Sequence, residues 1–156
     1  MLIKIAFCFD ENLVEQVKVA IASLLDYGVT EQVHYSIYCV CTEKAAYIET
    51  QLARIVEARD CKSLLNVKVA KNLYGDAYEV RGITSGAYLR LMLHRILPDV
   101  DKIIYVDIDV LFCGDLLQVW QTDMTDDVVA AVKGPVNLSD KWEWNRSRPY
   151  WQSLEG

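Results

Sequence analysis

Short apolar runs alternate with amphipathic segments along the first half of this chain. Residues Ile3–Phe9, Val33–Val40 and Asn66–Val69 are rich in β-branched and aromatic side chains, which favours strands. Leu13–Gly28 and Glu43–Arg59 carry apolar side chains at helical spacing, which indicates helices. Strands that alternate with helices form parallel sheets, because each helix returns the chain to the same end of the sheet. The sequence therefore predicts an α/β fold with a mainly parallel sheet flanked by helices.

The ends of these helices carry capping signals. Asn12 precedes the first helix, Glu15 follows three residues later, and Gly28 closes that helix. Thr42 precedes the second helix. We therefore expect Asn12 to cap the first helix and the second helix to begin directly after Thr42.

The second half of the chain continues this pattern as far as residue 132. A helix is predicted from Thr84, its N-cap, to Leu97, with Pro98 just beyond its end. Its core-facing positions are expected to be Tyr88, Leu91, Met92 and Ile96. Later elements are expected at Lys102–Val106 (strand), Asp115–Trp120 (helical turn) and Val128–Val132 (buried strand). Residues 133–156 contain three tryptophans without a clear period, so we expect one domain over residues 1–132 and an irregular tail over residues 133–156.

The composition argues against several classes of protein. With 156 residues, of which 53% are hydrophobic, the chain is long enough for one ordered domain. A net charge of −6 and the lack of lysine and arginine clusters argue against a nucleic-acid partner. No run approaches the roughly 18 apolar residues of a membrane span, and no signal peptide is recognisable, which favours a cytoplasmic protein. The five cysteines lack CxxC spacing, so we expect reduced, small apolar residues.

Asp107 and Asp109 follow a strongly apolar run and are separated by one isoleucine. In an extended backbone the side-chain period is two, so both carboxylates leave the same face and can reach one divalent cation. Burial of an unpaired carboxylate is costly, so acids in such an apolar context need a cation, hydrogen-bond donors or water. A metal bound to phosphate is the favoured interpretation, and a solvated strand end is the alternative.

Polar residues also follow the first strand. Asp10 and Asn12 lie where Ile3–Phe9 ends, and open α/β sheets bind ligands at the carboxyl ends of their strands. The two acidic turns are therefore expected to share a cleft, although turn and helix capping alone would also explain Asp10 and Asn12. Neither GxGxxG nor the P-loop pattern GxxxxGKS or GxxxxGKT occurs, which argues against a dehydrogenase-type dinucleotide fold and against a P-loop.

Two segments carry a resemblance to a known family. They are IAFCFDEN near the N-terminus and TSGAYLRLMLHRILPDVDKIIYVDIDVLFCGDLLQVWQTDM in the middle of the chain. At this separation they resemble glycosyltransferase family 8, and the resemblance covers nearly the whole sequence. It implies a Rossmann-like GT-A fold that binds a UDP-sugar with manganese and transfers a hexose with retention at the anomeric carbon.

The resemblance also implies roles for individual residues. Asp107 and Asp109 match the DxD aspartates that ligate manganese, or magnesium in its place, and Ile108 matches a backbone contact to the nucleotide. Asp10 and Asn12 match residues that contact the uridine. A further match, Arg90, corresponds to an arginine near the donor sugar and its phosphates, although an arginine on a helix is more often a surface or ion-paired residue. No catalytic residue is assigned.

Two departures from the family pattern limit what the resemblance implies. Leu13 stands where the family usually has a tyrosine that stacks on uracil, which leaves donor affinity and base preference open. The family's third metal ligand, a histidine, and its acceptor-binding residues belong to a second half without a counterpart here, and neither His34 nor His94 matches that ligand. We therefore expect the donor-binding, N-terminal part of a C-terminally truncated enzyme.

Three functional interpretations remain open. The first is an active hexosyltransferase that uses UDP-glucose or UDP-galactose and a glycan acceptor, as in lipopolysaccharide biosynthesis. The second is a catalytically incomplete fragment that binds the UDP-sugar without transfer. The third is a non-catalytic remnant that binds a partner chain, because the tryptophan-rich tail is typical of self-association or of contact with a complementary C-terminal segment.

Overall fold

The computed structural model describes residues 1–71 and 85–131. The chain divides into two compact units, Met1–Thr122 and Asp123–Gly156, and only residues 123–131 of the second unit are described. The predicted cap at Thr84 and the predicted tail over residues 133–156 lie outside the described residues, so the cap and the proposed domain boundary stay predictions. None of the described helices has the length and apolar character needed to cross a membrane.

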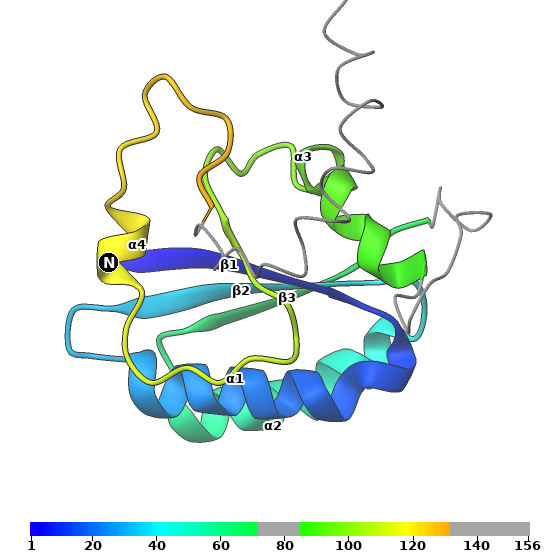
Figure 1. Ribbon diagram of the computed structural model, residues 1–156. Coiled ribbons are helices and arrows are strands. Elements are labelled where there is room, and N and C mark those ends of the chain that lie inside the picture. Colours follow the sequence, from blue (N-terminus) through cyan, green and yellow to red (C-terminus); the bar gives the residue numbers. More distant parts are fainter. Residues whose placement is uncertain (72–84, 132–156) are drawn as a thin grey trace, which may run out of the picture. The chain divides into compact units, whose positions relative to one another are not determined.

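The first unit is built on a four-stranded parallel sheet (Figure 1). Its spatial order is β3-β2-β1-β4, formed by β1 (Leu2–Phe9), β2 (His34–Cys41), β3 (Leu64–Val69) and β4 (Ile104–Tyr105). The parallel sheet and its first three strands are confirmed. The fourth strand is shorter than the predicted Lys102–Val106, because only two of its residues pair with β1.

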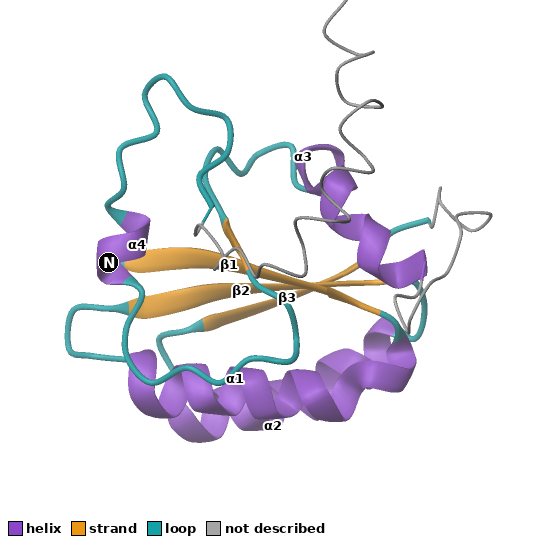
Figure 2. Ribbon diagram, in the orientation of Figure 1, coloured by secondary structure: helices purple, strands orange, loops and turns teal. Residues whose placement is uncertain are grey.

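Two long helices, α1 (Val14–Gly28) and α2 (Ala45–Arg59), cover one face of this sheet, as Figure 2 shows. Burial of a large apolar side chain stabilises a fold by about 1.5–3 kcal/mol. Tyr35 adds a specific tie between β2 and α1, because its hydroxyl donates to the Gly28 carbonyl at 3.0 Å. The core on this face includes Ile3, Ile5, Phe7, Phe9, Val17, Ile21, Leu24, Tyr35, Ile37, Ile48 and Leu52.

The starts of both helices differ from the predicted caps. A 3-10 turn, η1 (Glu11–Leu13), precedes α1, and Asp10 caps this turn by accepting a hydrogen bond from the Asn12 N–H at 2.9 Å. Helix α1 itself has no side-chain cap, so the predicted cap at Asn12 is wrong. Helix α2 begins after Lys44, whose φ is 54°, and not directly after Thr42. Asp10 stands at the N-cap position of the turn, where a short polar side chain can accept from the free backbone N–H groups. Asn12 lies inside the turn.

A shorter helical segment lies on the opposite face, towards the carboxyl end of the sheet. It consists of a 3-10 helix, η2 (Ser85–Met92), and one α-helical turn, α3 (Leu93–Ile96). A helix is thus confirmed over Ser85–Ile96, but most of it is a 3-10 helix, and the core-facing position predicted for Leu91 is wrong because Leu91 is 56% exposed. A 3-10 helix has three residues per turn, which rotates the buried positions relative to an α-helical pattern. The buried cluster here consists of Leu89, Cys8, Val40 and Ala70.

Beyond β4 the chain returns past α1 and ends the first unit with a helical turn, α4 (Leu117–Trp120), close to the predicted position. The Phe112 N–H donates to the Ser23 hydroxyl oxygen at 3.1 Å. The rings of Phe112 and Phe7 meet edge to face, with centroids 6.4 Å apart. These contacts attach the segment after β4 to the core between the sheet and α1.

The second unit differs from its prediction. Residues 123–131 contain no strand, so the strand predicted over Val128–Val132 is wrong for its described part. The segment instead forms turns, in which the Thr125 N–H donates to Asp123 Oδ1 at 3.0 Å and the Asp127 N–H donates to the Met124 carbonyl. An apolar run alone does not specify a strand, because a strand also needs a neighbour that pairs with it.

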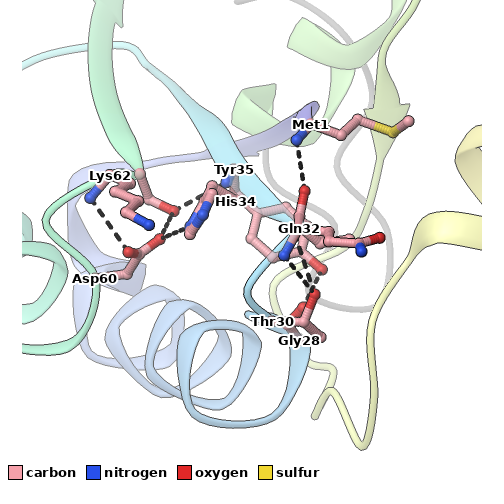
Figure 3. A network of polar contacts seen from close by, with 10 residues as sticks. Met1, Gly28, Thr30, Gln32, His34, Tyr35, Asp60 and Lys62 are labelled. Atoms are coloured by element: carbon pink, nitrogen blue, oxygen red, sulfur yellow. Dashed lines mark hydrogen bonds and ion pairs between the residues drawn. The ribbon is translucent and has the colours of Figure 1, made fainter.

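A polar network ties β2, α2 and β3 together at the amino end of the sheet (Figure 3). Asp60 is buried and accepts hydrogen bonds from the Ser63 hydroxyl at 2.6 Å and the Lys62 N–H at 3.2 Å, and it pairs with His34 Nδ1 at 2.8 Å. Burial raises the pKa of Asp60, but these hydrogen bonds outweigh burial, so its net pKa lies below the ordinary value. His34, to which the sequence assigns no chemistry, is a structural residue here.

Candidate functional site

Two acidic turns follow neighbouring strands at the carboxyl edge of the sheet. Asp10 directly follows β1, and Asp107 lies two residues beyond β4. These strands pair side by side, with Ala6 opposite Tyr105, whereas β2 lies on the other side of β1. From β1 the chain adds β2 and then β3 on one side, and it later adds β4 on the other side of β1. The strand order therefore reverses between β1 and β4. Open α/β sheets bind ligands at such a position.

Asp107 has two charged or polar partners. Arg90 of η2 forms an ion pair with it, with 3.0 Å between Nη1 and Oδ1. Tyr105 donates its hydroxyl hydrogen to the same oxygen at 2.5 Å. Arg90 also lies over the Tyr105 ring, 4.9 Å from its centroid, which is within the range of a cation–π interaction. The Asp107 side chain remains 53% exposed, so a ligand can reach this cluster from solvent.

The charges of this cluster also act on the sheet beneath them. Burial raises the pKa of the Cys8 thiol to about 12, while Arg90 lowers it and Asp107 raises it. Burial and then the hydrogen bond to Asp107 raise the pKa of Tyr105, and Arg90 opposes that rise. Cys8 therefore stays a protonated thiol, and Tyr105 stays a neutral hydroxyl donor. The cluster thus offers a carboxylate, a guanidinium cation and a hydroxyl group.

Ile108 separates Asp107 from Asp109, as a DxD spacing requires. Both aspartates are exposed, whereas Ile108 is half-buried and packs against the core that underlies α1. The backbone bends at Ile108 and Asp109 instead of continuing as a strand. The alternation of exposure nevertheless turns both acids away from the core, as the two-residue period predicts.

A pair of exposed carboxylates is a donor set that suits a hard divalent cation. Such cations prefer oxygen ligands, and magnesium is commonly held by one or two carboxylates together with phosphate oxygens. Among the described residues, no group of three or more His, Cys, Asp and Glu side chains converges on one point. The carboxylates of Asp107 and Asp109 fit a cation that is shared with a phosphate-bearing ligand.

Gly86 brings η2 against the first acidic turn. A side chain at this position would place its Cβ 3.1 Å from the Asp10 nitrogen and 3.4 Å from both Asp10 Cβ and the Phe9 carbonyl carbon. The absence of a side chain therefore permits the close approach of η2 to the end of β1. Because η2 also carries Arg90, this contact links the Asp10 turn to the cluster around Asp107.

The other residues of the first turn have different surroundings. Asn12 is exposed, and its backbone N–H donates to Asp10 Oδ1 at 2.9 Å. Leu13 is half-buried against the core. Glu11, which the sequence did not single out, pairs with Lys44 at 3.6 Å and adds a further acid at this edge of the sheet.

Sequence reasoning missed Tyr105 and Gly86. Tyr105 precedes Asp107 by two residues, so the period of an extended chain would have placed the two side chains on the same face. The role of Gly86 had no local signal, because its neighbours Phe9 and Asp10 are distant from it in the sequence. Only the packing of η2 on β1 reveals it.

The sequence matches the pattern of a protein family described as glycosyl transferase family 8 over residues 4–155. It is also 33% identical to General stress protein A of Bacillus subtilis (strain 168) over 69 residues. The matched region covers 43% of this chain and 24% of that protein. The family resemblance inferred from the two sequence motifs is confirmed.

Solved glycosyltransferase structures share the fold. The galactosyltransferase LgtC, solved in complex with donor and acceptor sugar analogs, is similar with a TM-score of 0.68 and 23% identity over 80% of this chain and 44% of that one. The bifunctional glycosyltransferase WbbM is similar with a TM-score of 0.69 and 19% identity over 85% of this chain and 23% of that one. GlyE of Streptococcus pneumoniae TIGR4 has a TM-score of 0.62 and 18% identity over 99% of this chain and 38% of that one. The expected Rossmann-like GT-A fold is confirmed, and the chain spans less than half the length of these proteins.

Proposed function

Because this chain belongs to glycosyl transferase family 8, we propose that it binds a UDP-hexose at the carboxyl edge of its sheet and takes part in retaining hexosyl transfer. The observation that carries the proposal is the contact of Arg90 and Tyr105 with Asp107, next to β1, the strand that Asp10 follows. A guanidinium cation beside exposed carboxylates suits a metal-bound diphosphate, because each charge of the ligand then has an opposite charge nearby.

Asp107 and Asp109 are proposed to hold a divalent cation, either manganese or magnesium. Such a cation, when bound, supplies Lewis-acid stabilisation of charge on the departing diphosphate. Arg90 is proposed to bind the phosphates, since its planar guanidinium is always charged and matches phosphate oxygens in pairs. Ile108 is proposed to contact the nucleotide through its backbone, while its side chain packs against the core.

The first turn is proposed to bind the uridine. The Asp10 carboxylate already caps η1 through one oxygen, and a carboxylate has lone pairs for further donors. Asn12 is exposed beside it and can donate or accept through its amide. Leu13 offers aliphatic surface where an aromatic ring would stack on the base, so we expect weaker stacking of uracil than a tyrosine would provide.

Donor binding and sugar transfer are separate parts of this proposal. All residues proposed here to bind the donor lie within Met1–Thr122, whereas the matched regions cover only 24% of General stress protein A and 44% of LgtC. A chain that binds the donor without transferring the sugar is therefore the second candidate function. The first candidate function, sugar transfer, includes three further proposals. The hexose is glucose or galactose, the acceptor is a glycan of the lipopolysaccharide type, and the protein acts in the cytoplasm. Self-association or a complementary C-terminal segment stays a prediction.

Calorimetric titration of UDP into the purified chain tests donor binding. We expect binding in manganese, a large loss of affinity in EDTA, and a similar loss in Asp107→Asn. Asp99→Asn is a matched control, because Asp99 is an exposed acid in the turn after α3. Absence of binding in both buffers would contradict the proposal. Release of UDP from UDP-glucose or UDP-galactose, with manganese and a glycan acceptor, then separates transfer from donor binding alone.

A further inference from the structure

We propose that Tyr105 is a positioning residue that holds Arg90 and Asp107 together for a metal-bound diphosphate. This inference rests on the proposed function and deepens it. Tyr105 uses two different parts of its side chain, because the hydroxyl contacts Asp107 Oδ1 at 2.5 Å and the ring lies 4.9 Å from the Arg90 guanidinium. One residue thereby contacts both of the charged groups that form the 3.0 Å ion pair.

The position of Tyr105 in the fold makes it a suitable support. Its backbone is fixed by parallel pairing of β4 with β1, opposite Ala6. Its side chain packs against the buried cluster that contains Leu89 and Cys8. Leu89 directly precedes Arg90 on η2, so the same cluster also fixes the element that supplies the guanidinium. The two charged residues come from different elements, and Tyr105 is the residue on which both contacts converge.

A neutral phenol suits this position better than another positively charged side chain beside Arg90 would. Arg90 and a metal ion both carry positive charge, so they compete for the Asp107 carboxylate. A neutral hydroxyl adds no repulsion beside a cation, and it can keep donating to Oδ1 while Arg90 contacts phosphate oxygens. Hydrogen-bond partners of metal-binding groups generally orient those groups, and their removal typically weakens metal affinity by about 10- to 100-fold.

Manganese titration at a fixed, saturating UDP concentration tests this role through the heat of binding. For Tyr105→Phe, which keeps the ring, we expect the manganese midpoint to rise about 10-fold or more. For Tyr105→Leu, which removes both contacts, we expect a larger rise. Tyr47→Phe is the matched control, because Tyr47 lies 52% exposed on α2, and it should titrate like the unaltered chain. A Tyr105→Phe midpoint within twofold of the unaltered chain would overturn the proposal.

A second measurement needs neither metal nor nucleotide, so it distinguishes failure of this inference from failure of the proposed function. In the metal-free chain, the NMR resonance of the Arg90 Nε–H group should carry a ring-current shift that persists in Tyr105→Phe and disappears in Tyr105→Leu. If this shift is present but the unaltered chain binds no UDP with manganese, the proposed donor site is wrong while the Tyr105–Arg90 contact stands. If the resonance is identical in all three chains, the positioning role is wrong whatever UDP does.

Discussion

Ile108 fixes the direction in which its two acidic neighbours point. Its side chain packs against the core below α1, and Asp107 and Asp109 on either side are exposed. A polar residue in its place would lose this packing. The apolar residue of the DxD motif therefore has a structural task as well as its proposed nucleotide contact.

Asp109→Asn is expected to remove most of the manganese-dependent UDP affinity, because a neutral amide is a much poorer ligand for a hard cation than a carboxylate. The free energy of unfolding should change by no more than about 0.5 kcal/mol, because Asp109 is exposed and contributes little packing. Calorimetry and urea unfolding measure the two quantities on the same sample. Unchanged affinity would remove Asp109 from the proposed site, and Asp99→Asn serves again as the control.

At the scale of single residues, the acidic site residues were predicted from the sequence, but the contacts that Tyr105 and Arg90 make with Asp107 were not. Asp10, Asp107 and Asp109 stand out because charged residues rarely interrupt apolar runs without a reason. Tyr105 is inconspicuous in an apolar strand, and its two-residue spacing from Asp107 indicates a shared face but not that its hydroxyl donates to the carboxylate. Arg90 was assigned through family resemblance, and its ion pair with Asp107 is visible only in three dimensions.

Among the elements, η2 depends on a glycine for its place. Gly86→Ala would bring a methyl group to 3.1 Å from the Asp10 nitrogen, so η2 must move away from β1 by a few tenths of an ångström. We expect this change to lower the free energy of unfolding by about 1 kcal/mol, the lower end of the cost of overpacking. Manganese-dependent UDP affinity should fall severalfold, because Arg90 moves with η2. Both effects are measured by urea unfolding and calorimetry.

Gly114→Ala is the matched control for this prediction. A Cβ at Gly114 would have no neighbour within 4 Å, so the same change of composition adds no clash there. Its stability should stay the same or rise slightly, because alanine restricts the unfolded chain more than glycine does. Equal behaviour of the two variants would show that the contact between Gly86 and the Asp10 turn does not position η2.

The network at the amino end joins three elements and predicts a dependence of stability on pH. The pKa of Asp60 in the folded chain lies below its ordinary value, which is about 3.9 in an unfolded chain. The unfolded chain therefore takes up a proton first as the pH falls, so the contribution of Asp60 is complete above about pH 5 and is lost below pH 4. Asp60→Asn should lower the free energy of unfolding at pH 7 by about 1–3 kcal/mol, the cost of leaving buried donors without their acceptor.

Urea unfolding between pH 7 and pH 3 measures this effect. The difference in free energy between the unaltered chain and Asp60→Asn is expected to shrink as the pH falls. Asp26→Asn is the control, because Asp26 forms an exposed ion pair with Arg59 on the neighbouring helices, and such pairs contribute little. A difference that stays constant over this pH range would contradict the assigned pKa direction.

Elements with a strong period were predicted well, and short or irregular elements were not. The runs that form β1, β2, α1 and α2 contain enough apolar residues to define a period and a buried face. Segment η2 carries apolar residues that fit a 3.6-residue period, yet it forms a 3-10 helix whose Leu89 packs with Cys8 of β1. Residues 128–131 show that β-branched composition without a pairing partner does not make a strand.

For the whole molecule, the boundary predicted at residue 132 has a direct test. A chain that ends at Val132 should fold cooperatively and keep its manganese-dependent UDP affinity. The reason is that the sheet, its helices and the cluster around Asp107 all lie within Met1–Thr122. Circular dichroism with urea, followed by calorimetry, compares this chain with the full one. Loss of cooperative unfolding would show that residues 133–156 are part of the same folding unit.

The overall architecture could be predicted from the sequence because a parallel sheet with return helices produces a regular pattern of apolar residues. Central strands are covered on both faces, so β1 and β2 read as nearly continuous apolar runs, and each return helix is amphipathic. The strand order was not accessible, since alternation of strands and helices fits several orders. The order β3-β2-β1-β4, which makes Asp10 and Asp107 followers of adjacent strands, comes from the structure alone.

The pairing of β4 with β1 sets the time at which the site can exist during synthesis. Strands β1, β2 and β3 are complete by Val69, so during synthesis they precede Tyr105 and the rest of β4. Contacts between distant parts of a chain form late because closing a long loop costs entropy. The nascent chain is therefore expected to form the first three strands of its sheet before Asp10 and Asp107 come close together.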